Sequence, residues 1–254
     1  MKELIRRGSS RALEIQITNK HTAVPKQRGK LINNQNNKVN LSRFFCREWC
    51  NLGEYNLLPE QELVIGGGFD DPTDAVVVIR GRTDPLAELR SDHEEADTRM
   101  ILHTWHASST KERIVIQSPD TDVAVLAIHV YQMIQCNEIW LKTGVKDKVR
   151  FIPVHLIAEK LGRSVCAAIP AFHALTGCDS TNGLFQIGKK KGWKVFERME
   201  ETGRQAVQNG GRSISKNYHG FWTLFVTFER KNLLLLLLSS NLSFFYSFKL
   251  HNKI

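Results

Sequence analysis

Short apolar runs alternate with amphipathic segments through the middle of the chain. Residues 62–67 and 75–81 are apolar, rich in Val or Ile and bounded by glycines, which predicts two strands. Residues 113–117 and 138–142 have the same character, and residues 150–162 predict a short strand that leads into a helix. Strands that alternate with helices are typical of βαβ units, so the pattern predicts an α/β fold with a mostly parallel sheet.

Apolar positions at helical spacing indicate further helices between and after these strands. These helices are predicted over residues 41–53, 91–107, 122–135, 164–177 and 189–201. Ser91 and Glu94 have the spacing of a capping box, which places a helix start there. Gly53 and Gly162 are expected to end two helices, and the Asn-rich residues 33–40 predict a loop.

The composition changes along the chain and predicts three regions. Residues 1–57 form a basic, Asn- and Lys-rich segment, and residues 58–203 form the folded core. Residues 204–254 are expected to be an irregular hydrophobic tail outside the fold. Its apolar stretch, residues 233–248, is shorter than the roughly 20 residues of a membrane span and is interrupted by Ser and Asn. A membrane partner is therefore not expected.

The chain is basic and its cysteines are scattered. A formal charge of +9 and a pI of about 9.4 favour a polyanionic partner, with nucleic acid first. Five cysteines without a framework spacing indicate a reducing, intracellular compartment. Cys46 and Cys50 lie four residues apart with no second pair, so a zinc site is not favoured. His103, His106 and His173 are interpreted as ordinary surface or core histidines.

Acidic residues gather in three clusters beside apolar segments. The clusters are Glu94, Glu95 and Asp97 at a predicted helix start, Asp120 and Asp122 directly after the strand at 113–117, and Asp179 after a predicted helix. Ligand sites of parallel sheets lie beyond the carboxyl ends of the strands. Crowded carboxylates become favourable around divalent cations, and Mg²⁺ and Mn²⁺ prefer oxygen ligands. Helix capping or an Asx turn would equally explain each cluster taken alone.

The motifs HEEADTRM, IQSPDTDVAVL and ALTGCDSTNGLFQIGKKKGWKVF resemble, in this order, those of flap endonucleases and related PIN-like 5′-nucleases. The residue sequences of these motifs are also similar to those of transposon-associated PIN-like proteins of invertebrates. The resemblance spans about residues 62–199. It implies a PIN-like three-layer fold with a mostly parallel central sheet, followed by a helix–two-turn–helix-like element.

The resemblance also implies a set of site residues and a reaction. The implied catalytic carboxylates are Glu95, Asp97, Asp120, Asp122 and Asp179, and the four aspartates would ligate two Mg²⁺ or Mn²⁺ ions. Gly188, Lys189, Lys190 and Lys191 would contact a backbone phosphate. The implied function is metal-dependent hydrolysis of phosphodiesters in branched or single-stranded nucleic acid, with DNA as the expected partner. An intracellular and nuclear location would follow from that substrate.

The sequence departs from the family pattern in two places, which motivates other interpretations. Gln186 stands where the family has the first glycine of its phosphate-binding hairpin, and no further aspartates precede residue 62 in a matching pattern. The chain is therefore expected to be an N-terminally incomplete copy. The alternative function is an inactive remnant that at most binds nucleic acid. A haloacid-dehalogenase-type phosphatase, disfavoured by Ala124, and a Toprim-type site use a similar acidic motif.

Overall fold

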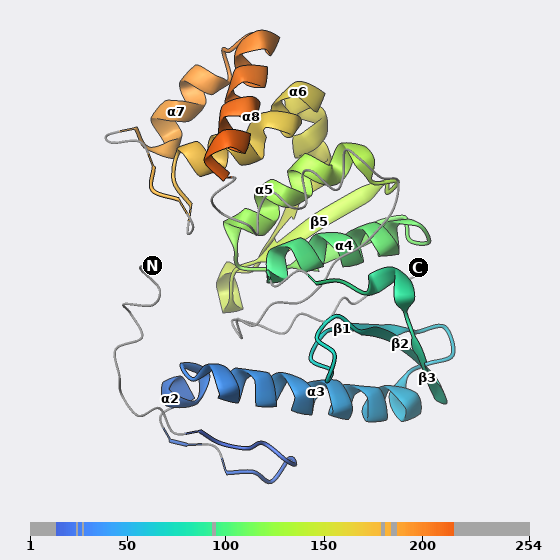
Figure 1. Cartoon of the computed structure of the whole chain (residues 1–254). Helices are drawn as coiled ribbons and strands as arrows, with labels where there is room; N and C mark the ends of the chain where they lie inside the picture. The colour runs from blue at the N-terminus through green and yellow to red at the C-terminus, as the bar shows by residue number, and fades with distance from the viewer. Residues whose placement is uncertain are drawn as a thin grey trace. The chain divides into compact units, whose positions relative to one another are not determined.

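The computed structural model describes most of the chain between residues 14 and 215. The described residues are 14–23, 25, 26, 28–92, 95–178, 181–183 and 187–215 (Figure 1). They divide between Arg90 and Ser91 into an N-terminal unit and a C-terminal unit. The predicted region boundaries at residues 57 and 203 lie elsewhere and stay predictions. No described helix combines the length and the apolar character that crossing a membrane requires.

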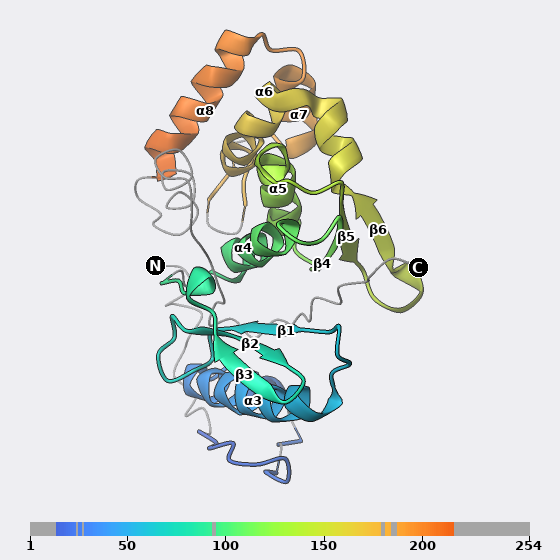
Figure 2. The ribbon, with the colours of Figure 1, turned by 90° about the vertical axis from the view of Figure 1, so that its right-hand side faces the viewer.

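The N-terminal unit pairs a long helix with a small antiparallel sheet. Its elements are α2 (Arg28–Ile32), α3 (Gln35–Asn56), β1 (Leu63–Gly66), β2 (Ala75–Ile79), β3 (Arg82–Pro85) and the 3₁₀ helix Ala87–Leu89. The strand order is β1-β2-β3, and both pairs are antiparallel. Figure 2 shows α3 beside the sheet of β1, β2 and β3. Cys46 of α3, Ile65 of β1 and Val78 of β2 form the buried contact between helix and sheet.

Two sequence predictions for this unit are wrong. Residues 33–40 were predicted to form a loop, but α3 begins at Gln35, and the buried Asn37 side chain explains why. Asn37 donates to the Leu31 carbonyl at 3.2 Å and accepts from the Ile15 amide at 2.7 Å, so its polar group is satisfied inside the unit. The helix also continues past Gly53 to Asn56.

The strands β1 and β2 were expected in a mostly parallel sheet, and this expectation is also wrong. Only residues 67–74 connect them, whereas a parallel pair needs a crossover of a dozen or more residues. The short connection therefore forces β1 and β2 to pair antiparallel. Two of the three acidic residues of this connection, Asp71 and Asp74, form ion pairs with Arg90.

The C-terminal unit is an α/β arrangement around a second small sheet. Its elements are α4 (Ala96–Ser108), β4 (Arg113–Gln117), α5 (Thr121–Val130), β5 (Glu138–Thr143), β6 (Arg150–Pro153), α6 (Val154–Leu175), α7 (Lys189–Phe196), α8 (Glu201–Ser215) and the 3₁₀ helices Tyr131–Met133 and Lys146–Lys148. β4 pairs parallel with β5, and β5 pairs antiparallel with β6. The sheet is therefore mixed. The prediction of an α/β class is confirmed.

Buried and half-buried side chains alternate along the strands of this sheet, so one face of the sheet packs into the core. Ile114 and Ile116 of β4 and Ile139 and Leu141 of β5 are almost completely buried, whereas Val115 between them is half-buried. Figure 2 shows α4 and α5 side by side next to the sheet. The connection between β5 and β6 covers only residues 144–149, which again is too short for a parallel crossover.

The helix that follows the first acidic cluster starts later than predicted. α4 begins at Ala96, with Glu95 in extended backbone at the N-cap position, so Ser91 does not cap it. The hydroxyl of Thr98 donates to the Glu95 carbonyl at 2.9 Å and closes the first turn. Glu94 of the predicted capping box lies outside the described residues.

The helical segment after β6 is interrupted at the glycine that the sequence indicated. Gly162 adopts a φ of 75°, which separates two helical parts of α6, as predicted. Trp193 and Phe196 of α7 pack against Phe172 of α6, and the rings of Phe172 and Phe196 stack at 4.8 Å between centroids. These ring contacts dock α7 on α6. Residues 204–215, assigned to an irregular tail, instead belong to helix α8, whereas the rest of that tail lies outside the described residues.

Two partly buried histidines of the C-terminal unit should make the protein less stable in acid. Burial lowers the pKa of His103 to about 3, with contributions from His106 and Arg99, and burial also lowers the pKa of His129. The unfolded chain binds protons at these histidines near their ordinary pKa of about 6.5, and the folded chain does not. The contribution of each histidine to the free energy of unfolding is therefore constant above that pH and falls below it, by at most about 1.4 kcal/mol per pH unit.

Urea unfolding between pH 7 and pH 4.5 would measure this dependence. His103→Gln should flatten the decline, while the same change at the exposed His21 should leave the decline as it is. An unfolding free energy that rises as the pH falls through this range would contradict the expectation.

Candidate metal-binding site

The strand β4 ends at the acidic motif that the sequence singled out. Asp120 is the N-cap of α5, and its side chain accepts a hydrogen bond from the Asp122 amide at 2.9 Å. The Asp120 amide in turn donates to the hydroxyl of Ser118 at 3.1 Å. One carboxylate oxygen of Asp120 is thus used for capping. Asp122 lies in the first turn of the helix, and its carboxylate is half-buried.

The first acidic cluster lies at the same end of the sheet. Residues 109–112 are the whole connection from α4 to β4, so the helix and the strand run in opposite directions. The start of α4 therefore lies toward the carboxyl end of β4. Asp97 is half-buried in the first turn of α4, and Glu95 is exposed at its N-cap.

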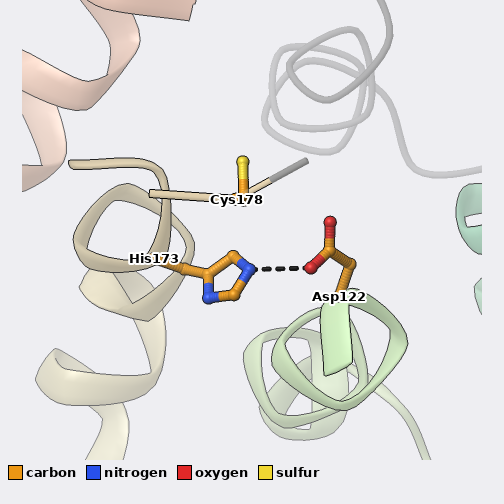
Figure 3. Close-up of side chains that lie close together, drawn as sticks. All are labelled: Asp122, His173 and Cys178. Atoms are coloured by element: carbon orange, nitrogen blue, oxygen red, sulfur yellow. Dashed lines mark hydrogen bonds and ion pairs between the residues drawn. The ribbon is translucent and has the colours of Figure 1, made fainter. Parts of the chain in front are cut away.

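His173 of α6 reaches the carboxylate of Asp122 (Figure 3). Its Nε2 lies 2.7 Å from Oδ1 of Asp122, and the imidazole is buried. The ammonium of Lys189 donates to the other ring nitrogen, Nδ1, at 3.3 Å and also to the Gly177 carbonyl. Since Nδ1 accepts this hydrogen bond, Nε2 carries the proton and donates it to Asp122.

Cys178 completes the group from a tight loop after α6. The backbone amides and carbonyls of Cys178 and Thr181 pair with each other at 3.1 and 3.2 Å. The hydroxyl of Thr181 donates to the Ala174 carbonyl at 2.7 Å, which ties the loop to the helix end. Gly177 enters this loop with a φ of 96°. The loop thereby holds the half-buried thiol of Cys178 next to Asp122 and His173.

Asp122, His173 and Cys178 form a cluster with the composition of a metal site. Within the described part of the chain, this is the one group of three potential ligands whose ligand atoms all lie within 4.8 Å of one another. Of the sequence-predicted metal ligands, the group contains Asp122 but neither Asp97 nor Asp120. Asp179 lies outside the described residues.

The donor atoms of this cluster decide which ions it fits. Mg²⁺ requires oxygen ligands in near-octahedral geometry, and the cluster offers one carboxylate, one imidazole and one thiol. This cluster by itself does not match the oxygen ligand set of Mg²⁺, and Mg²⁺ or Mn²⁺ bound by the carboxylates stays a prediction. Imidazole and thiolate suit zinc and its neighbours among the transition metals.

Sequence reasoning missed two members of the cluster. His173 was interpreted as an ordinary histidine, and it is indeed buried, but its ring also binds Asp122. Cys178 was interpreted as one of several scattered thiols. No spacing signal could have joined them to Asp122, because 51 residues separate Asp122 from His173 in the chain.

The predicted phosphate contacts lie at the start of α7. Gly188 is its N-cap, with an ordinary extended backbone, and Lys189, Lys190 and Lys191 form the first helical positions. Lys190 and Lys191 are exposed, whereas the ammonium of Lys189 turns back to His173 and Gly177. A phosphate-binding role for these residues stays a prediction.

Comparisons of this chain with protein-family models, with functionally characterised proteins and with solved structures found no match.

Proposed function

We propose that the C-terminal unit is a PIN-like, divalent-metal-dependent hydrolase of nucleic-acid phosphodiesters. One observation carries the proposal: the loop with Cys178 folds against Asp122 at the carboxyl end of β4. Asp122 and Cys178, which are far apart in sequence, thereby meet at the end of the sheet where α/β proteins bind ligands. The third motif begins α4 at that same end.

The residues at this position can orient a substrate and a metal ion. Asp120 fixes the first turn of α5, which sets the direction of Asp122. His173 holds the Asp122 carboxylate through Nε2 and limits its rotation. A divalent ion bound here would supply the positive charge that hydrolysis of a phosphodiester requires.

The charge of the chain suits a nucleic-acid substrate. The net charge of +9 favours binding to a polyanion, and Lys190 and Lys191 expose their ammonium groups at the N-terminus of α7. Amides at a helix N-terminus and lysines together attract phosphate without reading a base sequence. Binding of this kind should weaken with increasing salt concentration. DNA with branches or single strands is the proposed substrate, and the nucleus is the proposed compartment.

A second candidate is an inactive remnant that binds nucleic acid without cleaving it. Two hydrogen bonds favour this candidate: Lys189 contacts His173, and His173 contacts Asp122. Together they balance the negative charge of the Asp122 carboxylate without a metal ion. The two candidates differ in their response to divalent ions. An ion that binds only the folded state raises its melting temperature, so a functional site should be stabilised by Mn²⁺ or Zn²⁺ and a remnant should not.

The proposed hydrolysis is tested with labelled single-stranded and flapped DNA in the presence of Mn²⁺ or Zn²⁺. Wild-type protein should cleave, and Asp122→Asn should lose at least about 100-fold in rate, since the amide cannot ligate as the carboxylate does. Asp147→Asn is the matched control, because this exposed aspartate lies in the 3₁₀ helix before β6. Equal rates for wild type and Asp122→Asn would remove Asp122 from the mechanism.

A further inference from the structure

The cluster of Asp122, His173 and Cys178 has a donor set that the proposed nuclease chemistry does not explain. A nuclease that uses Mg²⁺ needs oxygen atoms, and two of the three donors here are nitrogen and sulfur. The side chains come from the start of α5, the second half of α6 and the following loop, so the whole fold of this unit brings them together.

We propose that Asp122, His173 and Cys178 bind a zinc-class transition-metal ion, with a fourth position open to water or substrate. Zinc sites with three protein ligands are the ones that keep an open position for chemistry. The inference names the metal of the proposed hydrolase site, and its catalytic meaning rests on that proposed function. Binding of the metal itself does not depend on cleavage.

The observed distances are close to those of a zinc site. With zinc bonds of about 2.0 Å to nitrogen and oxygen and about 2.3 Å to sulfur, tetrahedral ligand atoms lie roughly 3.3–3.6 Å apart. Nε2 of His173 and Oδ1 of Asp122 are 2.7 Å apart because a proton lies between them, and every pair in the group is within 4.8 Å. Shifts of about 1 Å, which side-chain rotation provides, would seat the ion. The Nε2 proton and the thiol proton would leave to solvent.

Lys189 opposes metal binding in this arrangement. A neutral imidazole that ligates through Nε2 carries its proton on Nδ1, and Nδ1 then cannot accept the hydrogen bond from Lys189. The Lys189 ammonium would keep its hydrogen bond to the Gly177 carbonyl and lose its hydrogen bond to His173. Lys189 thus competes with a metal ion for His173, and removing its ammonium should strengthen metal binding.

A group of Cys, His and Asp could instead activate the thiol as a catalytic nucleophile. The observed contacts do not support this role. Such a relay needs one ring nitrogen on the carboxylate and the other on the thiol. Here Nε2 of His173 faces Asp122, and Lys189 holds Nδ1. No ring nitrogen is left to take the proton of Cys178.

Three of the other four thiols are poor competitors for a metal ion. Cys46 is almost fully buried, donates to the Gly67 carbonyl at 3.0 Å, and burial raises its pKa to about 12. Burial also raises the pKa of Cys136 and of Cys166, and both thiols contact backbone carbonyls. A thiol that resists ionisation is a weak ligand. Cys50, four residues from Cys46, is the best internal control.

Cobalt titration of the full chain tests the proposal, because Co²⁺ occupies zinc sites and absorbs light. Wild-type protein should develop the near-ultraviolet charge-transfer band of a Co²⁺–thiolate bond and the visible bands of tetrahedral Co²⁺. Excess Zn²⁺ should remove both. Cys178→Ser should abolish the charge-transfer band and weaken binding at least about tenfold, and Cys50→Ser should change neither. Lys189→Met should lower the Kd about 2- to 10-fold, the equivalent of one hydrogen bond.

Several outcomes separate this inference from the proposed function. A band that requires Cys178, in a protein that cleaves no DNA, would support the metal site and reject the hydrolase. Absence of the band in wild-type protein with intact circular dichroism would overturn the metal site. A band that survives Cys178→Ser but disappears in Cys50→Ser would overturn it too, because it would assign the ion to α3. Cleavage with Mn²⁺ but no Co²⁺–thiolate band would overturn the site with Cys178 and keep the proposed hydrolase, with its metal held by carboxylates.

Discussion

Gly177→Ala is expected to lower the free energy of unfolding by about 2–4 kcal/mol and to abolish the Co²⁺–thiolate band. Gly177 has a φ of 96°, where a side chain is strained. A Cβ atom there would also lie 2.9 Å from the Gly183 nitrogen and 3.1 Å from its Cα, both backbone atoms. The close approach of Gly177 to Gly183 would have to open, and the pairing of Cys178 with Thr181 would be lost with it.

Chemical denaturation and cobalt titration of the same samples would measure both effects. Gly203→Ala is the matched control, because a Cβ at that position of α8 meets only Met199 side-chain atoms at 3.4 Å or more. That variant should be as stable as wild type or up to about 1 kcal/mol more stable, since alanine favours helix over glycine. A Gly177→Ala protein with unchanged stability and an unchanged cobalt spectrum would show that the loop does not position the thiol.

Ile116→Ala should destabilise the C-terminal unit by about 2–5 kcal/mol. Ile116 lies in the second half of β4, one side of the parallel pair with β5, and no part of it is exposed. Removing its side chain leaves a cavity in the cluster that also contains Val123 of α5. Because β4 runs directly into Asp120 and Asp122, metal binding should weaken together with stability.

The change in unfolding free energy can be compared with that of Ile187→Ala, which makes the same chemical change at a residue that is 43% exposed. The control should stay within about 0.5 kcal/mol of wild type. Similar losses for both variants would mean that β4 does not carry the core of this unit.

The local elements of the C-terminal unit were predictable because their signals are local. The strands at 113–117 and 138–142 are short, β-branched or aromatic and bounded by polar residues, and both form as predicted. Gly162 interrupts α6 through its own backbone conformation. Sheet topology was less predictable, since it follows from connection length, and residues 67–74 turned two expected parallel strands into an antiparallel pair.

The candidate site was only partly predictable from sequence. The position of Asp120 and Asp122 after a strand followed from the pattern of apolar and acidic residues, and the structure places them there. The partners of Asp122 could not be foreseen, because the bend of α6 at Gly162 and the loop after it bring His173 and Cys178 to it from more than 50 residues away. Sequence spacing reveals ligands within one helix or loop, and this cluster joins three segments.

The proposed function is tested most directly by metal depletion and metal return in the cleavage assay. Full-length protein is stripped with a chelator, its fold is checked by circular dichroism, and single metals are then added back with labelled flapped DNA. We expect no cleavage by the stripped protein and recovery with Mn²⁺, Zn²⁺ or Co²⁺, with recovery lost in Asp122→Asn. Cleavage that persists without metal, or a folded protein that cleaves with none of these ions, would contradict a metal-dependent hydrolase.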